Sequence, residues 1–171
     1  MRNLAGSTST RIILRPVGVV RNSISSGGRE VRWEAVVSDI LLDPAWAGAL
    51  EGIAGFSHVW VLFCFSQSAP PETLRTHPQG RADAPLVGRF ATRSPSRPNP
   101  IGMTPVELLA VEGNCLRVRG LDAFDGSPVL DLKPYLPQGD SLPQARVPDW
   151  LTRLQNGENE THCPGTQGNI K

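Results

Sequence analysis

The distribution of apolar residues predicts a chain of short strands rather than long helices. Residues 57–65 (SHVWVLFCF) are apolar at odd and even positions alike, which indicates a central strand or a strand of a closed barrel. Residues 11–20 (RIILRPVGVV) predict a β-branched strand in which Pro16 marks an edge or a bulge. Apolar and polar residues alternate over 31–35, the two-residue period of a half-buried strand. We expect residues 57–65 to form the centre of the core.

The second half of the chain predicts three further strands. Residues 103–111 and 116–119 flank Glu112-Gly113-Asn114, a turn sequence typical of a hairpin. Residues 129–132 predict the last strand. The strands therefore accumulate without a long helix between them, and the fold class that follows is mainly β.

Two short helices are expected between and after the strands. Asp43 precedes a proline, and a carboxylate can cap the free amides of a helix whose first position tolerates proline. This helix should cover residues 44–50 and stop at Gly52. Residues 148–154 predict the second short helix.

Length and composition predict one compact domain between two polar ends. The chain has 171 residues, of which 39% are hydrophobic, and this is enough to bury a sizeable core. We expect a disordered start over 1–10, a single domain over 11–154 and a flexible tail over 155–171. Within the domain, residues 68–84 are rich in proline and too long for an ordinary connection, so they predict a functional or a mobile loop.

The charge balance limits how the chain can bind nucleic acid. It carries 17 basic and 16 acidic residues, a net charge of +1, which excludes tight binding through bulk charge. Only Lys133 and Lys171 are lysines, so nearly all the positive charge is arginine. Arginine suits planar recognition of carboxylate and phosphate, although a GC-rich genome explains the total equally well. Any contact with a polynucleotide must be local.

Cysteine and histidine spacing predicts neither a disulfide framework nor a metal site. Cys64, Cys115 and Cys163 are odd in number and widely separated, which indicates reduced thiols. The three histidines lack metal-ligand spacing, so no structural metal is expected. The longest apolar run is far below the roughly 20 residues that span a bilayer. The start of the chain lacks the apolar stretch of a signal peptide, and we expect a cytoplasmic protein with no membrane partner.

The densest group of candidate binding residues lies in 88–103, GRFATRSPSRPNPIGM. Arg89, Arg93 and Arg97 recur every fourth residue, but three interspersed prolines exclude a helix. A loop stiffened by proline can hold guanidinium groups and the Asn99 amide towards a ligand. The alternative is a solvated connector whose arginines pair with surface acids, and spacing alone favours neither.

A second candidate segment is 121–135, LDAFDGSPVLDLKPY. A turn is expected over 125–128, after which Asp131, Lys133 and Tyr135 alternate with apolar residues along a strand. A hairpin with a solvated outer face is the commoner explanation. The concentration of two aspartates, a lysine and the only tyrosine nevertheless favours a site, and glycosidase-type acid and base chemistry has no further support.

Other familiar site types are not supported. His58 is expected to be a core or packing residue rather than a base, because no nucleophile motif surrounds it, and Cys64 a small buried apolar residue. No glycine fingerprint follows a strand and no P-loop lysine is present, so a Rossmann or P-loop nucleotide site is not indicated.

Three motifs together resemble the TsaA-like or TrmO family of tRNA threonylcarbamoyladenosine methyltransferases. They are GFSHVWVLFCF at 55–65, GRFATRSPSRPNPIGM at 88–103 and LDAFDGSPVLDLKPYLP at 121–137, in family order. The likeness extends from about residue 11 to residue 137. It implies a small β-barrel that binds S-adenosylmethionine outside a Rossmann fold, as a homodimer. It also implies methylation of the N6 nitrogen of threonylcarbamoyladenosine beside the anticodon of tRNA, with no metal.

The resemblance implies a cofactor site and a wider set of substrate contacts. The positions matched to the cofactor pocket are Ser66, Gln67, Arg93, Phe124, Asp125, Gly126 and Ser127, with Arg89 as a further cofactor candidate. The substrate candidates are Arg97, Asn99, Lys133 and Tyr135, and the catalytic candidates are Arg97, Asn99, Asp131 and Tyr135. Arginine suits a carboxylate, and aspartate suits ribose hydroxyls or an ammonium group. Catalysis should come mainly from positioning, and the group that removes the acceptor proton is not identified.

Two departures from the family pattern fall on expected cofactor contacts. Many relatives have histidine where this chain has Ser66, and many have a Pro-Arg-Gln string where this chain reads SSGGREVRW over 25–33. Two alternatives therefore stay open beside tRNA methylation. One is a methyltransferase for another small molecule or nucleoside, and the other is a noncatalytic dimer that binds the cofactor.

Overall fold

The computed structural model describes residues 12–27 and 30–156. These residues form two compact units. The first contains the described residues up to 67 together with 100–135, and the second contains 68–99 together with 136–156. The expectation of a single domain over 11–154 stays a prediction. The start 1–10 and the tail beyond residue 156 lie outside the described residues.

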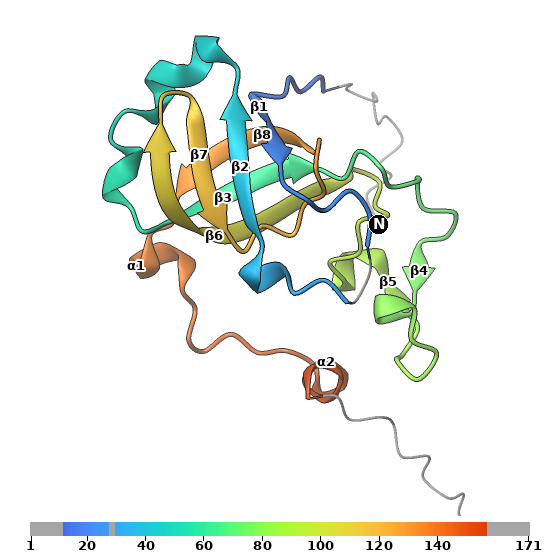
Figure 1. Ribbon diagram of the computed structural model, residues 1–171. Helices are drawn as coiled ribbons and strands as arrows, with labels where there is room; N and C mark the ends of the chain where they lie inside the picture. The colour runs from blue at the N-terminus through green and yellow to red at the C-terminus, as the bar shows by residue number, and fades with distance from the viewer. Residues whose placement is uncertain (1–11, 28–29, 157–171) are drawn as a thin grey trace, which may run out of the picture. The chain divides into compact units, whose positions relative to one another are not determined.

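The first unit is a closed barrel of six antiparallel strands in the order β1-β2-β7-β6-β3-β8 (Figure 1). Their bounds are β1 Gly18–Arg21, β2 Val37–Leu42, β3 His58–Cys64, β6 Ile101–Glu112, β7 Cys115–Arg119 and β8 Pro128–Pro134. Strand β8 closes the ring because it pairs with both β1 and β3. The expected mainly β fold with a small barrel is confirmed.

Alternate residues of the strands fill the barrel interior. Along β3, Val59, Val61 and Phe63 are fully buried, whereas the residues between them lie half-buried on the outer face. The same alternation buries Ser38, Ile40 and Leu42 of β2. The prediction that residues 57–65 form the centre of the core is confirmed. The apolar residues on both faces of β3 also place an apolar surface on the outside of the barrel.

Two predicted strands had the wrong boundaries. The strand expected over 11–20 is regular only from Gly18, and residues 12–16 are exposed, because the proline at 16 cannot donate to a strand ladder. The strand expected over 31–35 is wrong. Residues Trp33–Ala35 form the 3-10 helix η1, and the strand β2 starts afterwards.

The hairpin and the first short helix follow the expected turn chemistry. Strands β6 and β7 pair across residues 112–115. The side chain of Asp43 accepts a hydrogen bond from the Ala45 amide at 2.9 Å and caps Pro44–Leu50, which is the 3-10 helix η2 rather than an α-helix. A further 3-10 helix, η3, covers Ile53–Gly55 before β3.

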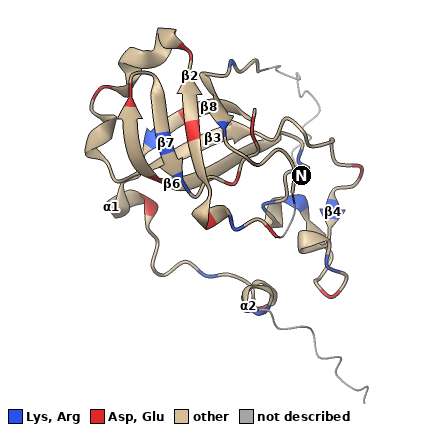
Figure 2. Ribbon diagram, in the orientation of Figure 1, with Lys and Arg blue, Asp and Glu red and all other residues tan. Residues whose placement is uncertain are grey.

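Ion pairs lie on the outer face of the barrel, where acidic and basic residues are interspersed (Figure 2). Arg117 of β7 contacts Asp39 of β2 at 2.8 Å, and Arg119 contacts Glu107 at 2.9 Å. The hydrogen bonds from Arg117 hold the pKa of the Asp39 carboxyl below its usual range. The barrel therefore presents no large surface of one sign along these strands.

The second unit contains short elements and two arms of the chain. Its elements are β4 Arg75–Thr76, η4 Pro78–Gly80, β5 Val87–Gly88, η5 Arg89–Ala91, α1 Pro137–Asp140 and α2 Asp149–Gln155. Strand β4 lies inside the region 68–84 that was expected to be a loop, and it pairs with β5, just after that region, in a two-stranded antiparallel sheet. The short helix predicted over 148–154 is confirmed as α2. No helix among the described residues is long and apolar enough to cross a membrane.

Candidate functional site

One end of the barrel gathers most of the predicted cofactor residues. Val19 of β1 and Phe63 of β3 lie opposite Pro128 and Val129 at the start of β8. The segments that follow β1 and β3 therefore lie at the same end as the segment that precedes β8. Ser66 and Gln67 follow β3, and Phe124, Asp125, Gly126 and Ser127 precede β8. The start of β6 joins this end, since the Phe65 amide donates to the Pro100 carbonyl at 2.8 Å.

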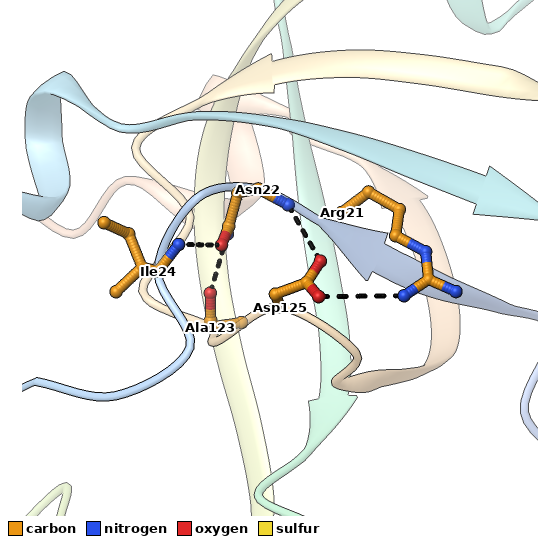
Figure 3. A network of polar contacts seen from close by, with 5 residues as sticks. All are labelled: Arg21, Asn22, Ile24, Ala123 and Asp125. Atoms are coloured by element: carbon orange, nitrogen blue, oxygen red, sulfur yellow. Dashed lines mark hydrogen bonds and ion pairs between the residues drawn. The ribbon is translucent and has the colours of Figure 1, made fainter.

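The turn at 124–127 is held by the last residues of β1 and the segment that follows them (Figure 3). The Asn22 amide donates to Oδ1 of Asp125 at 3.1 Å, and an Nη atom of Arg21 lies 3.7 Å from Oδ2. In return, the Asp125 amide donates to the Ile24 carbonyl at 2.7 Å and the Gly126 amide to the Val20 carbonyl at 2.8 Å. Backbone and carboxylate together fix the direction of Asp125.

Asn22 ties this turn to the barrel wall. Its side-chain amide donates to the hydroxyl of Ser38 and to the Ala123 carbonyl, both at 2.9 Å, and its side-chain oxygen accepts from the Ile24 amide at 2.9 Å. Ser38 is fully buried, so this bond satisfies a polar group inside the barrel. Asn22 is therefore a positioning residue for Asp125.

An aromatic pair lies beside the same turn. The ring centres of Trp33 and Phe124 are 5.7 Å apart, and the ring planes are tilted by 48° to each other. Trp33 belongs to η1, within the SSGGREVRW segment that was expected to depart from the family pattern. In the same turn, Gly126 has a φ of 78°, in the left-handed region that favours glycine. The backbone conformation is the reason for glycine here, because no atom lies within 4 Å of the position that a Cβ would take. The departing segment thus contacts the predicted cofactor turn directly.

The other candidates on β8 lie away from this turn. Asp131 forms a 2.6 Å ion pair with Lys133 on the outer face of the barrel. Tyr135 lies at the opposite end of β8, where its amide donates to the His58 carbonyl at 3.1 Å and its ring is 5.7 Å from Trp60. Strand β8 therefore has the turn at 124–127 before its first residue, and Lys133 and Tyr135 at its other end.

The arginines of 88–103 organise the second unit. Arg89 donates to the Thr73 carbonyl at 2.7 Å and to the Ser96 carbonyl at 3.1 Å. Arg97 donates to the Thr92 carbonyl at 2.8 Å and lies 5.9 Å from the centre of the Phe90 ring. These two guanidinium groups hold the fold of the loop itself. Arg93 and Asn99 are exposed.

Nδ1 of His58 lies 3.0 Å from the hydroxyl of its chain neighbour Ser57. His58 was expected to be a core or packing residue; it is exposed, so the core alternative is wrong and the packing alternative holds. Its ring packs at 6.2 Å from Tyr135. Cys64 and Cys115 are free, and burial raises the pKa of the Cys115 thiol, which disfavours the reactive thiolate. Cys163 lies outside the described residues. Within 12–27 and 30–156, no three His, Cys, Asp or Glu side chains are grouped to hold a metal ion.

Sequence reasoning missed Arg21, Asn22 and Trp33 as residues of this site. Arg21 and Asn22 lie about 100 positions before Asp125, and only the pairing of β1 with β8 brings them together. The one available signal was the RNS sequence at the end of a strand, since an asparagine side chain commonly forms a hydrogen bond with the backbone two residues further along the chain.

Comparison with known proteins agrees with the motifs. Residues 28–141 match the tRNA-methyltransferase O N-terminal domain. A probable S-adenosyl-L-methionine-binding protein of Methanothermobacter thermautotrophicus is 45% identical over 134 residues, which are 77% of this chain and 95% of that protein. The tRNA (adenine(37)-N6)-methyltransferase of Escherichia coli is 45% identical over 104 residues, which are 58% of this chain and 44% of that enzyme.

A solved structure gives the same result. The crystal structure of TrmO from Pseudomonas aeruginosa superimposes with a TM-score of 0.67 at 35% identity, covering 80% of this chain and 61% of the other. The family match over 28–141 includes five of the six barrel strands, all but β1, and the motif segments 88–103 and 121–137. On these matches, the chain belongs to the family of the tRNA-methyltransferase O N-terminal domain.

Proposed function

We propose that this chain is an S-adenosylmethionine-dependent methyltransferase that methylates the N6 nitrogen of threonylcarbamoyladenosine at position 37 of tRNA. The family match, the methyltransferase relative of Escherichia coli and the S-adenosylmethionine-binding archaeal relative support the reaction class and the cofactor. The threonylcarbamoyl group on the acceptor is the finer part of the proposal, and it rests on the family resemblance.

The observation that carries the proposal is the Asp125 turn beside Trp33 and Phe124. These residues fit S-adenosylmethionine, because a carboxylate accepts hydrogen bonds from ribose hydroxyls or an ammonium group and an aromatic pair packs against adenine. When bound, the cofactor supplies an electrophilic methyl group on its sulfonium. The protein's task is to hold the acceptor nitrogen in line with that group and to exclude water, which is catalysis by positioning.

Two measurements test this function. Calorimetry with S-adenosylmethionine and S-adenosylhomocysteine should show binding in the micromolar range or tighter, about 8 kcal/mol or more. The purified protein should then methylate tRNA from a strain that lacks this methyltransferase, measured by mass spectrometry of the released nucleosides.

A matched tRNA separates the acceptors. The same tRNA without its threonylcarbamoyl group should remain unmethylated. Methylation of that control would show that the enzyme accepts unmodified adenosine and does not require threonylcarbamoyladenosine. Cofactor binding without methylation of either tRNA, or of a panel of small nucleosides, would establish the noncatalytic alternative instead.

A homodimer is the second part of the proposal, supported by the apolar outer face of β6 and β3. Met103 is 54% exposed and Ile101 is 41% exposed, and they stand opposite Leu62 and Cys64 on the neighbouring strand. Contiguous apolar surface of this kind commonly marks a protein interface. The same face on a second copy provides a self-complementary partner, as a two-fold dimer requires.

Met103→Glu tests the dimer. We expect the wild type to sediment at twice the mass of one 18.5 kDa chain and the variant to shift to the monomer, because the introduced carboxylate would be desolvated in the interface. Leu74→Glu is the control, since Leu74 is 78% exposed in the second unit, outside that face. A monomeric wild type would contradict the dimer.

A further inference from the structure

The second unit contains a pocket of about 910 Å³. This volume lies within the roughly 300–1,000 Å³ of small-molecule sites. One wall comes from η5 and the residues after it, and the other comes from α2. The residues that matter for recognition are Phe90, Thr92 and Arg93 on the first wall and Trp150, Leu151 and Leu154 on the second. The α2 wall lies outside residues 28–141, which match the family model, and belongs to the C-terminal arm of the second unit.

The first wall presents an exposed aromatic ring and an exposed cation. Phe90 is 81% exposed, although phenylalanine is ordinarily buried. The Arg97 guanidinium lies 5.9 Å from its ring, and the same guanidinium bonds to the Thr92 and Ser94 carbonyls. Phe90 is therefore held in place at the surface by neighbouring groups. Arg93 stands exposed beside it.

The backbone at the pocket edge is strained. Gln79 of η4 lines the pocket and has φ 55° and ψ 19°, the left-handed conformation that residues other than glycine rarely adopt. Strained backbone of this kind clusters at ligand-binding sites. The pocket thus combines an aromatic ring on each wall with a cation, hydroxyls and a strained rim.

We propose that this pocket binds an unpaired nucleobase of the RNA substrate, between Phe90 and Trp150, with Arg93 on its edge or on the adjacent phosphate. The inference rests on the proposed tRNA acceptor, because the bases of an anticodon loop are single-stranded. Single-stranded RNA is recognised by stacking on aromatic side chains together with arginine. A chain of net charge +1 needs such local contacts, since its bulk charge gives little affinity for RNA.

The test uses the full chain and a synthetic anticodon stem–loop RNA with 2-aminopurine in its loop. We expect Trp150→Ala and Phe90→Ala each to weaken RNA binding about 10-fold and to reduce the quenching of 2-aminopurine, as loss of one stacking partner predicts. Trp46→Ala is the matched control, because Trp46 is 50% exposed on η2 in the barrel unit and does not line the pocket. Affinity for S-adenosylmethionine should be unchanged in all three variants.

Each other outcome overturns the inference in a distinct way. Wild-type RNA binding that both pocket variants retain would leave the tRNA acceptor standing and reject the pocket as its base site. A parallel fall in S-adenosylmethionine affinity would assign the pocket to the cofactor instead. Failure of the wild type to bind RNA would reject the proposed acceptor, and the pocket assignment with it.

Discussion

Replacing Gly102 with alanine is expected to destabilise the protein by about 1–3 kcal/mol, the usual cost of inserting a methyl group into a filled core. Gly102 stands opposite Phe63 across β6 and β3. A Cβ at this position would lie 2.4 Å from Cζ of the Phe63 ring and 2.7 Å from Cε1 and Cε2. The ring is fully buried and packs edge-on against Phe65 at 5.0 Å, so it has little room to move.

Thermal unfolding measures this effect against a matched glycine. Gly88→Ala is the control, because its φ is −63° and no atom lies within 4 Å of the added Cβ. The melting temperature should fall by at least a few degrees for Gly102→Ala and stay within about a degree for Gly88→Ala. The double variant Phe63→Leu with Gly102→Ala should lose less stability than the two single changes added together. Strict additivity would show that the ring and the glycine do not compete for space.

This glycine shows what a sequence motif can and cannot say. Gly102 ends the RPNPIG string, which in the sequence read as one functional loop around Arg97 and Asn99. In the structure, the residues of that string have different roles. Gly102 leaves room for the Phe63 ring in the barrel core, and Arg97 donates to backbone carbonyls that hold the turn of the second unit. A motif can therefore identify a family without assigning each of its residues to the ligand.

A strand could be predicted where its own hydrophobic pattern defines it, but a strand boundary that depends on a partner strand distant in the sequence could not. Residues 57–65 could be placed because apolar residues on both faces have few stable arrangements outside a core. The alternation over 31–35 was equally regular, but these residues lack a strand partner in the barrel, and β2 begins at Val37, opposite Arg119 of β7. The pairing strand decides where β2 starts, and local sequence does not contain it.

The candidate site divides in the same way. The Asp-Gly sequence predicted a turn over 125–128, because glycine supplies the positive φ that a turn requires, and the turn forms one residue earlier, over 124–127. Its partners Arg21 and Asn22 were not predictable, since their contacts depend on the closure of the barrel between β1 and β8. The separation of Tyr135 from that turn has a local origin, because the extended strand β8, Pro128–Pro134, lies between them.

The largest functional effect is expected for Asp125→Ala, which should weaken S-adenosylmethionine binding by roughly 10- to 100-fold, the range for loss of a hydrogen bond to a charged group. The change removes the acceptor for the Asn22 amide and the ion-pair partner of Arg21. It also removes the carboxylate that we propose accepts from the cofactor. Calorimetry on the purified variant measures the loss, and Asp122→Ala is the control, because Asp122 is exposed and bonds Thr104 outside the turn.

Asp125→Asn separates direct contact from positioning. Asparagine keeps an oxygen that can accept from the Asn22 amide, so the turn should stay in place, but it lacks the negative charge. If the carboxylate itself binds the cofactor, affinity in the asparagine variant falls nearly as far as in the alanine variant. Recovery of wild-type affinity would instead make Asp125 a positioning residue that acts through the segment after β1. An unaltered affinity in Asp125→Ala would remove this turn from the cofactor site altogether, because both roles of the carboxylate are lost in that variant.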